Sequence, residues 1–265
     1  LRALADAARI ANEDSWRALA VANGEFLFRE MVRDDRVFRS HKDGVTRIGG
    51  FLEDYAAIGL GAIALYELTF DPRWLSNART LADAMVQWFW DDDAEAFFDT
   101  PSDHEELLTR PRDFTDNATP SGTSLAVELL LRLGDVLGEA DMTRRARFVL
   151  ESIVEPMARY PLAFGHALTA ADMAVFGAVE VALAGSPGSD DLKELVRAAN
   201  ASFVPSLVLA GGSPDGAGVA LLADRPMRDG RATAYVCRGF VCDSPVTDAG
   251  ALWDQLSRAS RAGAL

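Results

Sequence analysis

The sequence predicts an all-α protein made of antiparallel helical hairpins, with a small mixed α/β segment at its C-terminal end. Three observations predict this fold. Helical periodicity dominates residues 1–201, and the connections between successive helices alternate between short and long. From residue 202 onward, short apolar runs lie among Gly, Pro and Asp turns, which is typical of short strands. The 265 residues are 49% hydrophobic and 25% charged, an ordinary globular composition.

Apolar residues at helical spacing predict eight helices in the first part of the chain: 1–11, 14–32, 51–69, 72–89, 121–137, 141–155, 168–184 and 190–201. Asp71-Pro72 combines an N-capping acid with proline at the first helical position, and Gly138 ends a helix. Asp43-Gly44 is typical of a hairpin turn, and a second hairpin is expected around Phe97-Phe98. Strands at 203–209 and 234–237 and a helix at 248–260 complete the chain.

The lengths of the connections indicate how the helices are arranged. The second and third helices are joined by about 18 residues and the fourth and fifth by about 31, whereas the other connections are much shorter. In an antiparallel array, alternate connections emerge at opposite ends, so the long loops gather on one rim. This pattern is typical of stacked helical hairpins, and the absence of a fixed-period repeat favours a closed α/α toroid over a solenoid. We expect a toroid portion at 1–201 and a mixed segment at 202–265 packed on it.

Composition excludes several classes of partner. The formal net charge of -14 disfavours nucleic acid and anionic membrane surfaces, since both require basic patches. No apolar stretch reaches the roughly 18 residues of a spanning helix, so no membrane partner is expected. Two cysteines are too few for a disulfide framework, which favours a reducing, cytoplasmic location. The chain begins with Leu and has no leader pattern, as expected of a fragment or a trimmed product.

Four segments of the chain, taken together, resemble the spermatogenesis-associated, thioredoxin-domain-containing protein family. They are GFLEDYA at 50–56, LYELTFDPRWL at 65–75, DNATPSG at 116–122, and AYVCRGFVC at 234–242 with PVTD at 245–248. The resemblance implies an N-terminal thioredoxin-like domain with a CxxC motif, followed by a toroid similar to six-hairpin glycosidases and N-acylglucosamine 2-epimerases. This sequence has no CxxC and too few helices for a twelve-helix ring. The resemblance therefore implies a C-terminal portion, with an incomplete six-hairpin toroid and a thioredoxin-like domain elsewhere in the same protein.

The long-loop rim is where we expect binding groups, because loops on a rigid scaffold usually carry them. The catalytic candidates are Asp54, Asp116, His104 and His166. The substrate-binding candidates are Glu53, Tyr55, Arg110, Asn117 and Ser121.

Each of these candidates also has a structural interpretation. Glu53 and Asp54 are either acids favoured by a helix N-terminus or the source of one catalytic carboxylate. Asp116 either stabilises a turn or is the second carboxylate of a sugar-processing pair, whose spacing would distinguish inverting from retaining chemistry.

The histidine and arginine candidates have the same two interpretations. His104 and His166 either act as acid and base, as in epimerases, or are an exposed and a packed histidine. Arg110, with Asp113, either clamps a carboxylate or phosphate or ties down the long loop.

The two cysteines are redox candidates. Cys237 and Cys242 are two buried thiols, a local disulfide, or part of an exchange path with the thioredoxin-like domain, and burial is the first interpretation. A lone cysteine pair and three dispersed histidines do not form a metal-binding pattern, so neither a metal nor another cofactor is expected.

The preferred function is that of a sugar-processing toroid, either an epimerase or isomerase or a glycoside hydrolase, acting on a sugar-like small molecule. The alternative is a non-catalytic recognition platform that works with the N-terminal thioredoxin-like domain. A deep polar and aromatic cavity on the rim favours the enzyme, and a shallow or filled one favours the platform.

Overall fold

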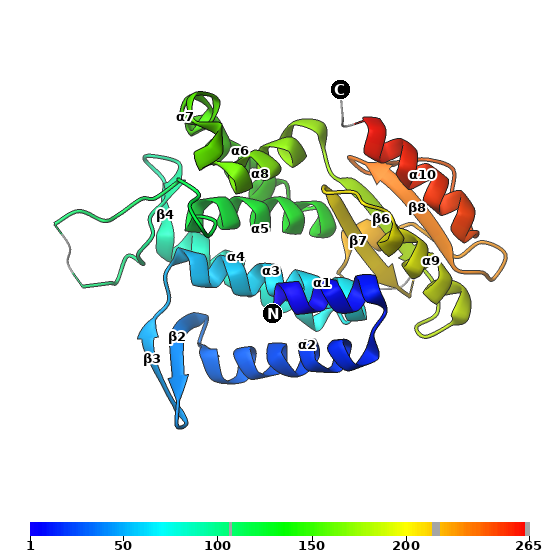
Figure 1. Ribbon diagram of the computed structural model, residues 1–265, viewed down its shortest axis with the longest axis horizontal. Helices are drawn as coiled ribbons and strands as arrows, with labels where there is room; N and C mark the ends of the chain where they lie inside the picture. Colours follow the sequence, from blue (N-terminus) through cyan, green and yellow to red (C-terminus); the bar gives the residue numbers. More distant parts are fainter. Residues whose placement is uncertain (106–107, 214–217, 263–265) are drawn as a thin grey trace.

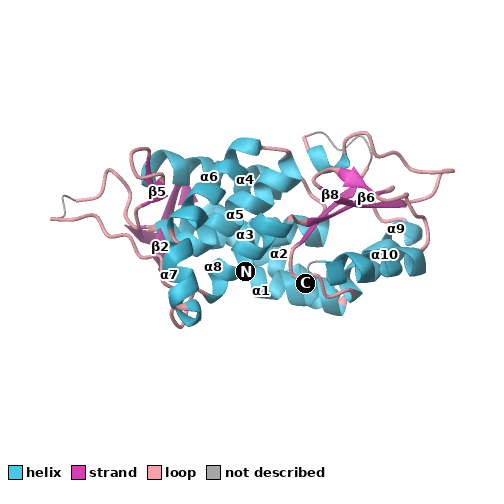
Figure 2. Ribbon diagram, turned by 90° about the horizontal axis from the view of Figure 1, so that it is seen from above, coloured by secondary structure: helices cyan, strands magenta, loops and turns pink. Residues whose placement is uncertain are grey.

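The structure, a computed structural model, describes residues 1–105, 108–213 and 218–262 (Figure 1). In this part of the chain, ten α-helices and three small sheets form a mostly helical protein. The helices lie in one layered body, and the largest sheet lies at one end of it (Figures 1 and 2). No helix in the described ranges combines the length and apolar character needed to cross a membrane.

The N-terminal part consists of two layers of helices. Its helices are α1 (Arg2–Ala11), α2 (Asp14–Phe26), α3 (Leu52–Thr69), α4 (Arg73–Phe89), α5 (Gly122–Leu137), α6 (Ala140–Ser152), α7 (Val154–Arg159) and α8 (Gly165–Phe176). In what we call the inner row, α1 packs on α3, α3 on α5, and α5 on α8. Helices α2, α4 and α6 pack outside α1, α3 and α5, respectively. The chain therefore alternates between the inner row and the outer layer, as hairpin stacking requires.

Most boundaries from α1 to α7 follow the sequence pattern, with two local differences. A π-helical turn at Leu27–Met31 continues α2, and the helix expected at 141–155 divides into α6 and α7. Pro156 lies within the first turn of α7, where its missing N–H would have no helical partner in any case.

Both expected hairpins are present. Strands β2 (Arg36–Lys42) and β3 (Val45–Gly49) pair antiparallel across the Asp43-Gly44 turn, and β1 (Val32–Arg33) pairs with β2. Strands β4 (Trp90–Asp91) and β5 (Ala96–Phe97) form the second hairpin. These hairpins and the connection that follows β5 lie at the end of the molecule where α3 and α5 begin (Figure 1). The long connections therefore share one end of the inner row.

The C-terminal part is a four-stranded sheet covered by two helices. The strand order is β7 (Leu207–Gly212), β6 (Val179–Ala184), β8 (Thr233–Arg238) and β9 (Val241–Cys242). The pair β6–β7 is parallel, and the other pairs are antiparallel. Helices α9 (Asp190–Ala201) and α10 (Ala249–Ala262) pack together and against these strands, while α5 and the short turn Ala220–Leu222 also contact the sheet.

The expected helix at 168–184 is wrong over its second half. Helix α8 ends at Phe176, Gly177 has a positive φ of 76°, and the following segment is strand β6. All six residues of β6 are buried because both faces of the sheet are covered. A strand buried on both faces has no polar alternation, so its sequence cannot be distinguished from a buried helix by periodicity. The first strand of the C-terminal segment begins at Leu207 rather than at 203. Residues 202–265 therefore do not build the sheet alone, because β6 and α9 precede them.

The helical part and the sheet meet where the end of α3 contacts β7. Phe70, the C-cap of α3, has a positive φ of 56°, and its ring lies directly on Gly211. A Cβ atom added at Gly211 would lie 2.4 Å from the Phe70 Cζ atom. The Gly211 N–H donates to the Tyr66 hydroxyl over 3.3 Å. Glycine is thus required at position 211 because the Phe70 ring lies too close for a larger side chain.

We expect Gly211→Ala to lower the free energy of unfolding by about 1–3 kcal/mol, since the added methyl group displaces the Phe70 ring from a packed interface. Urea denaturation followed by circular dichroism measures this loss. Gly49→Ala is the matched control, because a Cβ atom there meets nothing within 4 Å; its effect should stay within about 0.5 kcal/mol. Equal stabilities for the two variants would contradict this account of the interface.

Candidate functional site

The N-terminal ends of α3 and α5 approach each other closely because Gly122 has no side chain. A Cβ atom at Gly122 would lie 3.1 Å from the backbone nitrogen of Glu53 and 3.3 Å from the Cβ atom of Leu52. Ser121 caps α5, with its hydroxyl oxygen accepting a 3.1 Å hydrogen bond from the Ser124 N–H. Two helix N-termini, each carrying a partial positive charge, therefore lie side by side.

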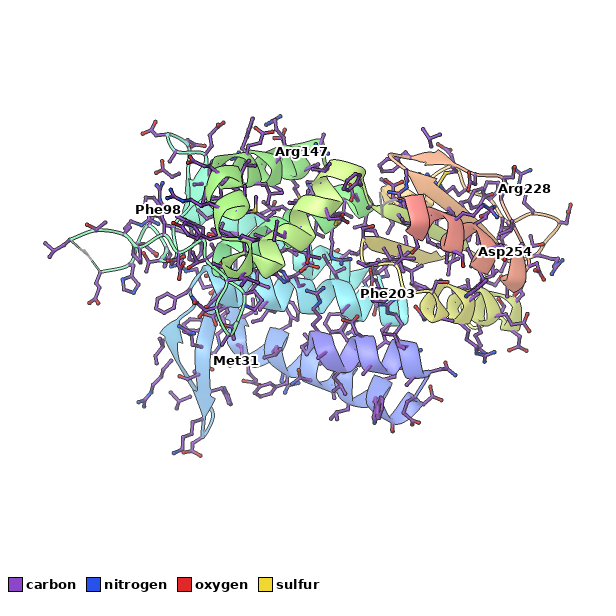
Figure 3. The ribbon with its side chains drawn as sticks, turned by 45° about the horizontal axis from the view of Figure 1, so that its top comes forward. Met31, Phe98, Arg147, Phe203, Arg228 and Asp254 are labelled. Carbon is purple, nitrogen blue, oxygen red and sulfur yellow. A yellow bond between two sulfur atoms is a disulfide. The ribbon has the colours of Figure 1, made fainter. Side chains whose placement is uncertain are left out.

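A cavity of about 220 Å³, which we call the rim pocket, lies over these two helix ends. It is lined by Phe51, Glu53, Asp99, Asp113, Thr115, Asn117, Thr119, Pro120, Ser121 and Gly122. Most of these residues belong to the connection between β5 and α5, which extends from this end of the molecule (Figure 1). Phe98, the neighbour of Asp99, is labelled at this end in Figure 3.

Hydrogen bonds to backbone groups place two acidic residues of the connection at the helix ends. The Leu52 N–H donates to the Asp99 carbonyl over 3.0 Å, which ties the connection to the start of α3. The Asp113 N–H donates to the Asp99 carboxylate over 2.9 Å. The Thr123 hydroxyl of α5 donates to the Asp113 carbonyl over 3.1 Å. Asp99 and Asp113 are therefore fixed to each other and to both helices.

The rim pocket has three carboxyl groups in different electrostatic environments. Glu53 forms a 2.7 Å ion pair with Arg39, and the Asp113 carboxylate accepts hydrogen bonds from the N–H and hydroxyl of Thr115 over 2.9 and 2.7 Å. Burial raises the pKa of Asp99, and the negative charges of Asp113 and Glu53 raise it further, against the opposing hydrogen bond from the Asp113 N–H. A carboxylic acid with a raised pKa beside other carboxylates is an arrangement suited to proton transfer.

The two carboxylates expected to be catalytic, Asp54 and Asp116, are engaged at helix ends and do not line the rim pocket. Asp54 accepts a 2.8 Å hydrogen bond from the Phe51 N–H at the start of α3 and lies 3.2 Å from Arg39. Burial raises the pKa of Asp54.

Asp116 joins the starts of α5 and α8. Its Oδ1 atom accepts a 2.9 Å hydrogen bond from the Ser121 N–H, and its Oδ2 atom accepts from the N–H groups of His166 and Ala167 over 2.8 and 3.0 Å. Burial opposes ionisation, but these hydrogen bonds together hold the pKa of Asp116 below its usual value.

The two histidine candidates lie in different places. The His166 Nε2 atom lies 2.9 Å from the Glu128 carboxylate, which also pairs with Arg2 and Arg132 in the inner row. His104 is exposed, and its ring centroid lies 6.2 Å from that of Phe51 at the side of the rim pocket.

Of the substrate-binding candidates, Glu53, Asn117 and Ser121 line the rim pocket, and Tyr55 and Arg110 do not. Tyr55 is buried, with its ring centroid 5.0 Å from that of Phe89. Arg110 lies 3.8 Å over the Phe98 ring and donates to the Thr100 carbonyl over 2.6 Å, which ties down the long connection.

Sequence reasoning missed Asp99, a carboxyl group with a raised pKa that lines the rim pocket. Asp99 directly follows the expected hairpin around Phe97-Phe98. An acidic residue directly after a strand was the sequence signal that could have identified it as a site residue. Its distance from Asp113 along the chain hid the contact between them, which depends on how the long connection folds back.

The expectation that Cys237 and Cys242 are two buried thiols is wrong, because the two residues form a disulfide. Cys237 is buried, but Cys242 is exposed on β9. The cysteines face each other across the β8–β9 pair, a register that residue spacing alone did not settle. Over residues 1–105, 108–213 and 218–262, no group of three or more His, Cys, Asp or Glu side chains is placed to hold a metal ion.

We expect Asp116→Asn to lower the free energy of unfolding at pH 7 by about 1–3 kcal/mol, because an amide cannot accept all three backbone hydrogen bonds. The pKa of Asp116 is lowered by folding, so its contribution is complete above the unfolded value of about 3.9 and is lost as the pH falls further. The difference between wild type and variant should therefore shrink below about pH 4 in urea titrations.

Asp141→Asn is the control for this measurement, since Asp141 is exposed and its ion pair is with Arg144 on its own helix. A difference between wild type and Asp116→Asn that stays constant down to pH 2 would contradict the assigned role of the carboxylate.

The chain is similar to curated proteins, although no family model matches it. It is 31% identical to spermatogenesis-associated protein 20 of Homo sapiens over 205 residues, which are 75% of this chain and 26% of the human protein. The protein of the same name from Rattus norvegicus is 30% identical over 205 residues, again 75% of this chain and 26% of the relative. The uncharacterized protein B0495.5 of Caenorhabditis elegans is 27% identical over 207 residues, which are 77% of this chain and 28% of that protein. The chain thus spans about a quarter of the length of the curated relatives it matches, and its homologues include proteins named spermatogenesis-associated protein 20.

Proposed function

We propose that the rim pocket binds one sugar-like unit and that the chain is the pocket-bearing part of a carbohydrate-processing protein. The observation that carries this proposal is the placement of Asp99, an acid with a raised pKa, between Glu53 and Asp113 over two adjoining helix N-termini. Acid–base chemistry on sugars commonly uses two carboxyl groups whose environments give them different pKa values.

The lining of the rim pocket suits a polyhydroxylated ligand. Its carboxylates accept hydrogen bonds from hydroxyl groups, and the Asn117 amide and Thr115 hydroxyl both donate and accept. Phe51 adds an apolar ring, over which the Arg39 guanidinium lies at 4.6 Å. A volume of about 220 Å³ is below the roughly 300–1,000 Å³ of drug-sized ligand sites, so the pocket accommodates one ring rather than an extended chain.

The chemistry that fits these groups is proton transfer. Asp99 is the general acid that protonates a sugar oxygen, because its environment favours the protonated form. Asp113 is the partner carboxylate, oriented by its hydrogen bonds from Thr115. A glycoside hydrolase uses such a pair of carboxyl groups, and an epimerase or isomerase needs an acid and a base, roles that carboxyl groups can also fill. Asp54 and Asp116, the carboxylates first expected in these roles, act as positioning residues that hold the helix ends.

The layered helices are consistent with part of an α/α toroid. The inner row and its outer layer are stacked antiparallel hairpins, and the curated relatives are about four times as long as the matched segment. We propose that further helices of the longer protein complete the ring. We also propose that the thioredoxin-like domain implied by the resemblance lies elsewhere in that longer protein.

We expect a monosaccharide, amino sugar or sugar phosphate to raise the melting temperature of the protein in a thermal-shift screen. A ligand at about 100 times its Kd adds roughly 2.7 kcal/mol of stability. Asp99→Asn and Asp113→Asn should each abolish the shift, whereas Asp141→Asn, which removes an exposed carboxylate from α6, should retain it.

Two results would contradict the proposal. One is the absence of a shift with every sugar tested; the other is a shift that persists in both pocket variants. Either result favours the recognition platform, for which the small volume of the rim pocket is the supporting observation.

A further inference from the structure

The disulfide between Cys237 and Cys242 lies within one hairpin at the edge of the C-terminal sheet. Cys237 on β8 is directly opposite Cys242 on β9, and the Asp243 N–H donates to the Val236 carbonyl over 2.9 Å in the next pair. The cysteines therefore occupy a non-hydrogen-bonded position, where facing side chains lie closest. Strand pairing keeps the two sulfur atoms opposite each other whether or not they are bonded.

The bond adds little constraint to the fold. The cysteines are separated by only five positions, and the stabilisation from a disulfide grows with the length of the loop that it closes. The turn has its own anchor, because the Phe240 N–H donates to the buried Glu180 carboxylate of β6 over 2.9 Å. Stapling the hairpin is thus a weak reason for a disulfide at this position.

The two sulfur atoms differ in access. Cys237 is 2% exposed, inside the sheet, whereas Cys242 is exposed on the edge strand beside Val241, which is 78% exposed. Thiol–disulfide exchange requires a thiolate to reach one sulfur atom of the bond. The geometry admits that approach at Cys242.

A buried arginine faces both sulfur atoms. The Arg225 Nη2 atom lies 3.4 Å from Cys242 Sγ and 3.7 Å from Cys237 Sγ, and the residue is 8% exposed. Its Nη1 atom donates to the Ala223 carbonyl over 3.2 Å, while its buried Nε atom has no hydrogen-bond partner within the described ranges. A guanidinium is a strong donor to an anion and a weak one to a neutral disulfide sulfur. Arg225 is therefore better suited to the reduced, thiolate form of the pair.

Two acidic groups complete the charged surroundings. Burial raises the pKa of Glu180, and the positive charge of Arg225 opposes this shift. Burial, together with the charge of Glu180, raises the pKa of Asp135 on α5 to about 7. Arg225 therefore lies next to the sulfur atoms, and Glu180 lies behind the hairpin turn.

We propose that Cys237 and Cys242 form a thiol–disulfide exchange site that accepts electrons from an external dithiol through Cys242, with Arg225 stabilising the thiolate that leaves from Cys237. The exposed edge strand, the buried partner sulfur and the buried guanidinium beside both sulfur atoms support this assignment together.

The exchange balances as two displacements. A thiolate of the external dithiol attacks Cys242 Sγ, a mixed disulfide forms, and the bond to Cys237 breaks to leave the Cys237 thiolate beside Arg225. The second thiol of the same molecule, as its thiolate, then attacks the external sulfur of the mixed disulfide and releases Cys242. The dithiol becomes a disulfide and loses two electrons, which the cysteine pair gains, and the two protons pass to the cysteine thiolates or to solvent.

The first test measures the rate at which dithiothreitol reduces the oxidised protein at pH 7, by quenching with iodoacetamide and counting labels by mass spectrometry. We expect Arg225→Gln to slow reduction roughly tenfold, because the leaving thiolate loses its cation. Arg225→Lys should restore most of the rate. Arg228→Gln is the matched control, since Arg228 is exposed on the same part of the chain (Figure 3) and should leave the rate unchanged. Equal rates for wild type and Arg225→Gln would overturn the role of Arg225.

The second test does not depend on substituting the buried arginine. Cys237→Ser leaves Cys242 alone, and Cys242→Ser leaves Cys237 alone. With oxidised glutathione, we expect the mixed disulfide to form at least about tenfold faster on Cys242 than on Cys237, because only Cys242 is exposed. Reaction on Cys237 at the same rate or faster would overturn the assignment of Cys242 as the sulfur that is attacked.

Discussion

The arrangement of the inner row depends on one buried carboxylate. Glu128 lies in the middle of α5 and is almost fully buried, and it accepts 2.8 Å hydrogen bonds from both terminal nitrogens of Arg2 on α1, a 2.7 Å bond from Arg132 and a 2.9 Å contact from His166 on α8. Burial raises the pKa of Glu128, but these partners together hold it far below its ordinary value. A buried charge is tolerated only when its partners are all in place, so this group fixes α1, α5 and α8 relative to one another. Through its contact with Glu128, His166 therefore has a structural role in the described fold.

The rim pocket is a consequence of that arrangement. Once the inner helices are fixed, their first turns meet at one end, where Gly122 permits contact and Asp116 joins the starts of α5 and α8. The long connection then folds over these ends and brings Asp99 and Asp113 beside Glu53. Backbone N–H groups from α5 and α8 hold the pKa of Asp116 below its usual value, whereas burial and the charges of Asp113 and Glu53 raise the pKa of Asp99. Carboxyl groups with lowered and raised pKa values thus lie at the same rim, set by burial, neighbouring charges and hydrogen-bond partners.

The two proposed sites lie at opposite ends of the molecule: the rim pocket at the start of α3 and α5, and the cysteine pair in the sheet (Figures 1 and 2). Helix α5 reaches both ends. Its first residues line the rim pocket, its centre holds Glu128, and near its end Arg132 donates to the Leu207 carbonyl of β7 over 2.8 Å. Helix α5 is thus the element that contacts both the rim pocket and the sheet.

Local sequence patterns specify most of the helices, both hairpin turns and the rim on which the long connections gather. These features follow from local periodicity, from Asp43-Gly44 and from Asp71-Pro72, whose effects act within a few residues. Whether 179–184 is a strand depends on long-range packing, because the covering of both sheet faces makes an uninterrupted apolar run a strand rather than a helix. Long-range packing also separated Asp54 and Asp116, which hold helix ends, from Asp99, whose proton affinity depends on Asp113 across a folded connection. The disulfide likewise required the register of β8 and β9. The burial of a side chain and the charges around it depend on contacts between residues distant in sequence, and local sequence patterns do not specify those contacts.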